Sequence, residues 1–187
     1  MQIIDAAVIV IAQNGYHQAQ VSKIAKQAGV ADGTIYLYFK NKEDILISLF
    51  REKMGYFVEQ IQEGIKEKSS AVDKLFVLIQ KHFQILSEDP NLAIVTQLEL
   101  RQSNKELRHR INDVLKGYLD LVDRIVIEGK ETGEFRSTLN VKLMKNMIFG
   151  TMDEVATTWV INDQKYSLTD LVPEVHRLLT NGCSSSN

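Results

Sequence analysis

The chain contains very little cysteine and proline. Its single cysteine, Cys183, lies in a Ser/Asn-rich C-terminal segment, which excludes an intramolecular disulfide and a cysteine-based metal site. A chain without disulfides is typical of a reducing compartment, and we expect the cytoplasm. Two prolines in 187 residues, with almost no strict alternation of apolar and polar residues, predict an all-α chain.

Long apolar runs and a strong net charge are also missing. No run of 18 apolar residues and no signal peptide is present, so we expect no membrane association. A formal net charge of −2 argues against a protein that coats nucleic acid indiscriminately. The four histidines lack metal-ligand spacing, and there is no Gly-rich phosphate loop and no Ser-His-Asp or Cys-His arrangement. We therefore expect no enzyme, no metal and no cofactor.

What is present is enough apolar material for a substantial core, with 44% hydrophobic and 25% charged residues. Apolar residues at helical spacing predict about nine helices. Asn41, Ser70, Ser103 and Ser167 are the predicted N-caps, and Gly15 is a predicted C-cap. The helical segments are residues 2–14, 21–28, a short one about residues 35–39, 41 to about 68, 70–87, 91–101, about 106 to 129 or 133, 141–162 and about 168–181.

The stretch Val21–Leu46 carries the first functional signal. Apolar residues of a short amphipathic segment end at Gly29, and a second short segment places Ile35 and Phe39 four residues apart. Two short helices about a Gly-containing turn form a helix-turn-helix unit, which lays its second helix in the DNA major groove.

Charge near this stretch is only locally basic. Residues 20–42 hold four lysines and one aspartate, a net charge of +3, whereas over residues 1–50 four acids cancel the four lysines. Tight binding to one DNA site therefore requires a dimer or a basic arm upstream of Met1.

Residues 24–43, IAKQAGVADGTIYLYFKNKE, resemble the DNA-binding signature of the TetR family of transcriptional repressors. Gln20 and Ala31 depart from it, because the family often has Ser or Thr there. The runs Leu98–Asn104 and Phe149–Glu154 resemble the fatty-acid-metabolism repressors of this family found in bacilli. The resemblance implies a helix-turn-helix domain at 1–44, a ligand-binding and dimerisation domain at 45–182, and a flexible tail at 183–187.

The resemblance also implies a function and its site residues. Such repressors bind palindromic operators of fatty-acid degradation genes as homodimers and leave DNA when long-chain acyl-CoA binds. Ser22, Gly33 and Thr34 would approach base edges, with Lys23 beside them. Tyr36, Tyr38 and Lys42 would contact phosphates, which positions a protein without reading sequence.

An acyl chain needs an apolar tunnel between helices, with cations where the CoA phosphates emerge. Ordinary core packing explains the apolar candidates equally well. Asp153 and Glu154 lie inside an apolar helix, and at least one of them should meet an arginine or line the cavity, because an unpaired buried carboxylate is costly. The expected lining residues are Phe57, Ile61, Ile79, Phe83, Leu98, Arg101, Tyr118, Val122, Phe149, Met152 and Asp153, with Arg108, Arg110 and Arg124 as further phosphate candidates.

The last two helices suit a dimer interface, because two-helix hairpins at chain ends commonly pair into four-helix bundles. The same apolar stripes could be internal core. The expected interface residues are Val141, Met144, Ile148, Val155, Trp159, Leu168, Leu171, Val175 and Leu178.

Two alternatives remain open. A repressor of an efflux gene in the same family would respond to a cationic drug, and acids inside the cavity without a basic rim would favour it. A helical interaction module without DNA binding is disfavoured by the lysines and tyrosines on one face of the helix-turn-helix. In either repressor, ligand binding would shift the long helix that begins near Asn41.

Overall fold

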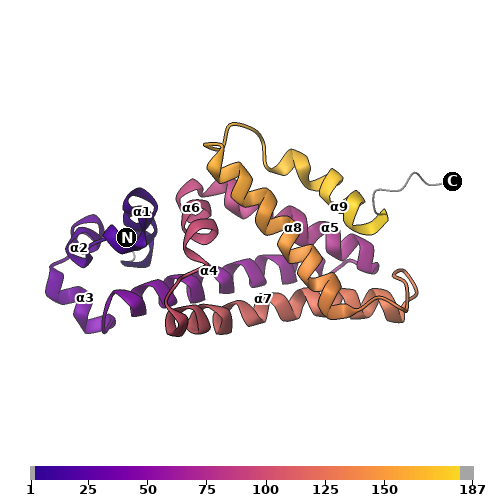
Figure 1. The fold of residues 1–187 in the computed structure, drawn as a ribbon, viewed down its shortest axis with the longest axis horizontal. Helices are drawn as coiled ribbons and strands as arrows, with labels where there is room; N and C mark the ends of the chain where they lie inside the picture. Colours follow the sequence, from indigo (N-terminus) through magenta and orange to yellow (C-terminus); the bar gives the residue numbers. More distant parts are fainter. Residues whose placement is uncertain (1–2, 182–187) are drawn as a thin grey trace. The chain divides into compact units, whose positions relative to one another are not determined.

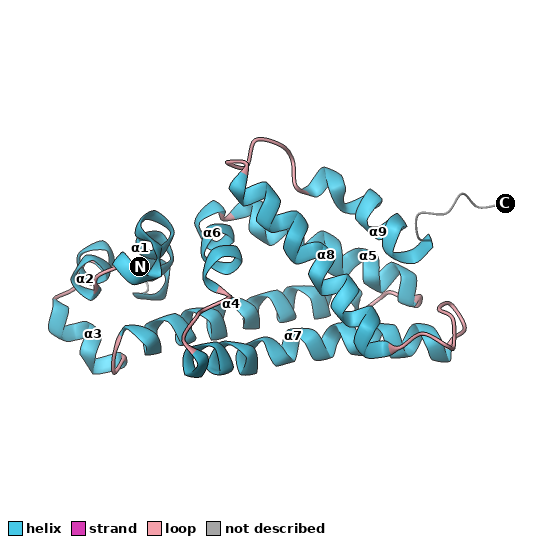
Figure 2. Ribbon diagram, in the orientation of Figure 1, coloured by secondary structure: helices cyan, strands magenta, loops and turns pink. Residues whose placement is uncertain are grey.

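The computed structural model describes residues 3–181 and contains, within that range, helices and loops but no strand (Figures 1 and 2). It confirms the predicted all-α fold and the expected number of helices. The elements are α1 (Ile3–Gln18), α2 (Val21–Ala28), α3 (Asp32–Tyr38), α4 (Lys42–Ile65), α5 (Ala71–Glu88), α6 (Pro90–Glu99), α7 (Lys105–Glu131), α8 (Val141–Ile161), the short 3₁₀ helix η1 (Thr169–Leu171) and α9 (Val172–Asn181).

The helices group into two compact units. Unit 1 comprises Met1–Met54 and Asp89–Leu115, and unit 2 comprises Gly55–Glu88 and Lys116–Asn187. This grouping differs from the division at residue 44 expected from the sequence, because α6 packs against α1 and because α4 continues past that position. The tail at 183–187, with Cys183, lies outside the described residues.

In unit 1, α1 packs against both α2 and α6, and α2 packs against α3. Gly29 ends α2 with a φ of +72°, a left-handed conformation that glycine adopts without a Cβ penalty. Gln20 and Ala31 precede α2 and α3, and neither side chain caps its helix, as expected where the usual Ser or Thr is absent. The buried side chains include Ile4, Ala7, Val8, Ile11, Ile24, Ala25 and Ile35.

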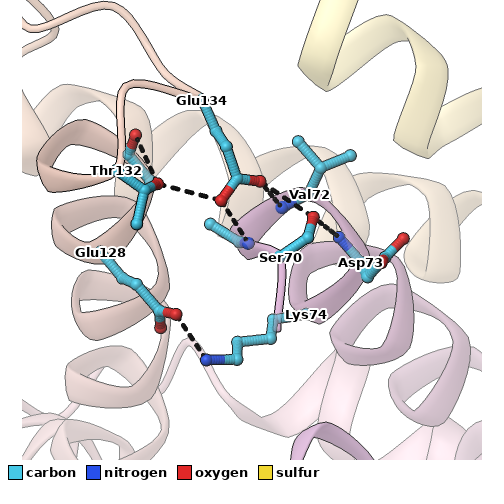
Figure 3. A network of polar contacts seen from close by, with 9 residues as sticks. Ser70, Val72, Asp73, Lys74, Glu128, Thr132 and Glu134 are labelled. Carbon is cyan, nitrogen blue, oxygen red and sulfur yellow. Dashed lines mark hydrogen bonds and ion pairs between the residues drawn. The ribbon is translucent and has the colours of Figure 1, made fainter. Parts of the chain in front are cut away.

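In unit 2, α5 contacts α8 and α9 and is buried over much of its length. The α7–α8 connection is fixed to the first turn of α5 by Glu134 (Figure 3). Its carboxylate accepts hydrogen bonds from the backbone N–H of Ala71 and Val72 at 3.1 Å each and from the Ser70 hydroxyl at 2.9 Å. An acid at a helix N-terminus satisfies donors that have no partner within the helix.

Two of the four predicted N-caps are confirmed. Asn41 and Ser70 each accept a hydrogen bond from the backbone N–H three residues further on, at 2.8 and 3.1 Å. Ser167 accepts one from the Asp170 backbone N–H at 3.3 Å, but Leu168 is the residue that precedes η1. The prediction for Ser103 was wrong, because the side chain of Asn104 caps α7 instead, at 2.9 Å. Both side chains accept hydrogen bonds well at a cap, so the motif alone did not choose between these neighbours.

Candidate functional site

The exposed side of α3 presents large side chains to solvent. Ile35 is fully buried, whereas Tyr36, Leu37 and Tyr38 are 58%, 81% and 69% exposed. Both tyrosines were predicted to contact DNA, but Leu37 was not. Its position off the buried face of α3, where a polar residue is usual, could have indicated an exposed apolar contact. Bulky apolar side chains left in water on a short helix indicate a surface that meets a partner.

Smaller predicted contacts lie on the same two helices. Ser22 on α2 and Gly33 on α3 are exposed, and Thr34 is partly exposed. A Cβ added at Gly33 would meet no atom within 4 Å, and its φ is not positive. Nothing within the chain therefore requires glycine at this position, which favours close approach by a partner over a simple turn.

Two predicted lysines are held by the protein itself. Lys23 Nζ donates to Asn14 Oδ1 at 3.0 Å. Lys42 is partly buried, and its Nζ donates to the backbone carbonyls of Tyr16 and His17 at 2.9 and 3.0 Å. The Lys42 ammonium also lies 4.6 Å from the centre of the Tyr16 ring. Lys42 thus has an intramolecular role that the sequence pattern did not indicate.

Glu99, at the end of α6, was missed entirely. Its Oε1 accepts a hydrogen bond from the backbone N–H of Tyr16 at 2.8 Å, and its Oε2 accepts one from Gln102 Nε2 at 2.7 Å. Contacts between positions 83 residues apart leave no signal in local spacing. The only hint was that Glu99 is the single charged residue of α6.

Unit 2 encloses a cluster of aromatic rings drawn from four helices. The ring centres of Phe57 and His82 are 5.2 Å apart, and those of His82 and Tyr118 are 5.7 Å apart. The Tyr118–Phe149 pair and the His82–Phe83 pair each have ring centres 6.0 Å apart. Three of these four pairs are edge-to-face, and such contacts stabilise an interior beyond simple burial. Four of the five residues were predicted to line a ligand site.

Polar groups lie inside this cluster. The Tyr118 hydroxyl and His82 Nδ1 are 3.0 Å apart, and His82 Nε2 is buried without a hydrogen-bond partner among the described residues. Burial lowers the pKa of His82 to about 4, so its ring is neutral at pH 7. Burial, and then the charge of Asp153, raises the pKa of Tyr118. The expectation that His82 is a hydrogen-bonded core residue matches this geometry.

The remaining predicted lining residues divide between the units. Leu98, which is about half exposed, and Arg101 belong to unit 1. Asp153 on α8 is almost fully buried, while its neighbour Glu154 is exposed. The other members in unit 2 are all buried, and they are Ile61, Ile79, Val122 and Met152.

Of the other arginine candidates, two are engaged within unit 1. Arg108 donates to the Gln102 and Ser103 carbonyls at 3.0 and 3.3 Å, and Arg110 lies 3.6 Å from Asp44. Arg124 instead lines an open cleft of about 270 Å³ in unit 2. The cleft is lined by Gln62, Ile65, Lys66, Lys74, Leu121, Arg124, Ile125 and Glu128.

The predicted dimer stripe is largely internal. Met144, Ile148, Trp159, Leu168 and Val175 are buried within the chain itself, so these five side chains are not available to a partner. The N–H of the buried Trp159 indole is paired, because its Nε1 donates a hydrogen bond to the Tyr166 carbonyl at 2.7 Å. Only Leu178 is exposed, while Val141, Val155 and Leu171 are partly exposed.

A different stripe on α8 faces solvent. Leu143, Met147 and Ile161 are each more than half exposed. They lie at helical spacing with Gly150, where an added Cβ would meet no atom within 4 Å. The exposed apolar residues of α8 therefore differ from those predicted for the interface.

Two negative findings concern residues 3–181 only. In that range no helix is long and apolar enough to cross a membrane. Nor does the described part of the chain contain a group of three or more His, Cys, Asp or Glu side chains able to hold a metal ion.

Comparison with known proteins agrees with this arrangement. Residues 3–49 match the family of bacterial regulatory proteins of the tetR type, and residues 50–182 match the C-terminal region of YsiA-like proteins. The fatty acid metabolism regulator protein of Bacillus subtilis is 67% identical over 97% of this chain and 94% of its own.

Two solved structures are closely similar. The transcriptional regulator FadR from Bacillus subtilis, in complex with stearoyl-CoA, superimposes with a TM-score of 0.96 at 66% identity, covering 98% of this chain and 99% of that one. The fatty acid degradation regulator FadR from Bacillus halodurans gives a TM-score of 0.95 at 62% identity, covering 97% and 98%. The chain therefore belongs to the TetR family of bacterial transcriptional regulators.

Proposed function

We propose that this protein is a homodimeric repressor that binds a palindromic operator of fatty-acid degradation genes and is released by long-chain acyl-CoA. The observation that carries the DNA-binding part is the exposed surface of α3, with Tyr36, Leu37 and Tyr38 in solvent above the buried Ile35. The effector part is supported by the relative that was solved with stearoyl-CoA. Because the operator is cytoplasmic DNA, we place the protein in the cytoplasm.

The aromatic cluster of unit 2 is the proposed acyl site. Its rings are largely apolar, as a long hydrocarbon chain requires of its surroundings. Within it, His82 Nε2 lacks a partner, which is costly for a buried polar atom. The thioester carbonyl of an acyl-CoA is a polar group on an otherwise apolar chain, and it could satisfy that nitrogen. Ligands without such a group would leave the nitrogen unpaired.

The CoA phosphates are proposed to bind at the cleft beside Arg124. Ile61 and Val122, two buried residues predicted to line the ligand site, are immediate chain neighbours of Gln62 and Leu121 in the cleft. Lys66 and Arg124 supply positive charge at its exposed rim, and the carboxylate of Glu128 is already paired with Lys74 at 2.5 Å. Charge-assisted hydrogen bonds from such cations are a common means of holding phosphates.

Release of DNA follows from linkage. A ligand can shift the protein from its DNA-binding state only if it binds another state more tightly, and DNA then weakens ligand binding by the same factor. Helices α4 and α7 each contribute residues to both units, so they provide covalent continuity between the proposed acyl site and the recognition surface.

The deciding experiment is a gel-shift titration on an upstream operator fragment with palmitoyl-CoA, palmitate and a cationic drug. We expect release by palmitoyl-CoA at micromolar concentrations, because acyl chain and phosphates both contribute. Release by the drug alone would favour the efflux alternative, which the buried carboxylate of Asp153 supports. No release by palmitoyl-CoA below millimolar concentration would reject the effector assignment and leave the operator assignment intact.

The same titration tests the phosphate cleft through Arg124→Glu, with Arg51→Glu on the exposed surface of α4 as the matched control. We expect Arg124→Glu to weaken release by palmitoyl-CoA on the order of tenfold, as loss of charge-assisted hydrogen bonds predicts. Binding to the operator without effector should be unchanged. An Arg124→Glu protein that responds like the control would place the phosphates elsewhere.

A further inference from the structure

The last turn of α1 is structurally separate from the rest of that helix. Gly15 has φ +71° and ψ 154°, which breaks the helical path inside α1. The backbone N–H of Ala19 then donates to the Gly15 carbonyl at 3.0 Å, closing one further turn. We name residues 15–18 the exit turn. Because of the break, its N–H and carbonyl groups depend on partners outside α1.

Glu99 supplies the partner at the N–H end of the exit turn. Its Oε1 accepts the hydrogen bond from the Tyr16 backbone N–H at 2.8 Å. Gln102 fixes the same carboxylate, because its Nε2 donates to Glu99 Oε2 at 2.7 Å and to the Glu99 carbonyl at 3.1 Å. Gln102 is buried, so the orientation of the carboxylate is set by packing.

Lys42 supplies the partner at the carbonyl end. Its ammonium binds the Tyr16 and His17 carbonyls at 2.9 and 3.0 Å. Lys42 is also the first residue of α4, separated from the recognition helix α3 only by residues 39–41. An anion at the N–H end and a cation at the carbonyl end both interact favourably with the dipole of a helical turn.

A second contact ties the same part of the chain to the α3–α4 connection. Arg110, near the start of α7, lies 3.6 Å from Asp44. The other carboxylate oxygen of Asp44 accepts a hydrogen bond from the Lys40 backbone N–H at 3.2 Å. The segment from Glu99 to Arg110 therefore makes two contacts near the recognition helix. Glu99 contacts the exit turn at Tyr16, and Arg110 contacts Asp44 in the first turn of α4.

We propose that Glu99 and Lys42 are positioning residues that set the recognition helix through the exit turn. Displacement of the α6–α7 connection would move Glu99, and with it Tyr16, His17 and Lys42. This role rests on the operator-binding function proposed above. It also gives Lys42 a different task from the one its sequence position suggests, because its ammonium holds the protein backbone instead of a DNA phosphate.

The test compares Glu99→Ala and Lys42→Met in the full-length protein with wild type, using operator DNA over a range of salt concentrations. We expect operator affinity on the order of tenfold weaker in each variant, within the usual range of coupling between sites. The slope of log affinity against log salt should be unchanged, because no phosphate contact is lost. Glu106→Ala and Lys105→Met, both exposed on α7, are the matched controls and should behave as wild type.

A second readout separates positioning from damage to the fold. If the variants disfavour the DNA-binding state, palmitoyl-CoA should bind them as tightly as wild type or more tightly. Glu99→Gln keeps an acceptor oxygen for the Tyr16 N–H and should restore most of the operator affinity.

Four results would overturn the proposal. The first is unchanged operator affinity in both Glu99→Ala and Lys42→Met. The second is a salt slope reduced by about one in Lys42→Met, which would mark a lost phosphate contact. The others are joint loss of operator and palmitoyl-CoA binding, and no recovery of operator affinity in Glu99→Gln. If wild type binds operator but not palmitoyl-CoA, only the effector assignment fails, and the operator measurements still decide the role of the exit turn.

Discussion

His82 is held in the interior of unit 2 in its neutral form. Its ring is surrounded by Phe57, Phe83 and Tyr118, and its pKa is lowered to about 4 because burial penalises the charged ring. An ordinary histidine titrates near 6.5. The unfolded chain therefore takes up a proton at this position at a higher pH than the folded chain does, which makes stability depend on pH.

The first prediction concerns this linkage. The folded pKa lies below the unfolded one, so the contribution of His82 is fully present above pH 6.5 and is lost as pH falls toward 4. Between pH 6.5 and 5 we expect the unfolding free energy of wild type to fall by on the order of 2 kcal/mol more than that of His82→Leu. Urea unfolding at several pH values measures it. Parallel pH curves for the two proteins would show that His82 does not titrate differently on folding.

Residue types also show where sequence reasoning stops. The most buried positions of the two short helices followed from the apolar pattern, because Ile24 and Ala25 on α2 and Ile35 on α3 were expected on the inner faces and are all buried. The partners of Lys23 and Lys42 did not follow, since a lysine beside a recognition helix is equally compatible with a DNA phosphate and with a backbone carbonyl. Long flexible side chains choose partners that local spacing does not encode.

At the scale of elements, Glu134 joins the α7–α8 connection to the start of α5 (Figure 3). Beside it, Lys74 in the first turns of α5 pairs with Glu128 of α7 at 2.5 Å. Hydrogen bonds from the Ala71 and Val72 backbone N–H groups and from the Ser70 hydroxyl lower the pKa of Glu134 to about 2. The loop between α7 and α8 is thus fixed by its acid to the N-terminus of a third helix.

A stability prediction follows from this contact. Glu134→Gln removes the negative charge and should lower the Tm at pH 7. Because the folded pKa is depressed, the stabilisation is present above about pH 4.5 and disappears as pH falls toward 2. The Tm difference between the two proteins should therefore be constant from pH 7 to 5 and shrink below that. Glu131→Gln, an exposed acid at the end of α7, is the control. A difference as large at pH 2.5 as at pH 7 would mean that shape and not charge fixes the loop.

Element positions were more predictable than element ends. Regular apolar spacing located α5 and α8 to within a residue or two, because both bury a continuous face. Spacing did not reveal that Gly15 breaks α1 without ending it, since the turn beyond is held by Glu99 and Lys42. The final helix was expected as one piece, and the structure divides it into η1 and α9.

At the scale of the whole molecule, α8 carries apolar side chains on two faces. Met144, Ile148 and Trp159 are buried within the chain, whereas Leu143 and Met147 are exposed. Helical spacing alone gives each face the same signal, so the sequence predicted an interface on the face that holds Met144 and Ile148, whereas the exposed face holds Leu143 and Met147. Apolar side chains exposed to water along a helix are unfavourable in free energy. A second copy of the chain that covers them would remove this unfavourable exposure.

The last prediction tests this dimer surface. Leu143→Glu combined with Met147→Glu places two charges of the same sign where an isologous interface would bury them, and unpaired buried charges strongly disfavour association. We expect a monomer by sedimentation at micromolar concentration, with operator affinity at least on the order of tenfold weaker, because two half-sites are no longer bound together. Ile127→Glu, an exposed apolar residue on α7, is the control and should remain dimeric.

The Tm at fixed concentration should fall for the double variant and become independent of protein concentration, because dissociation no longer accompanies unfolding. A double variant that sediments as a dimer would mean that the exposed stripe of α8 is not the interface.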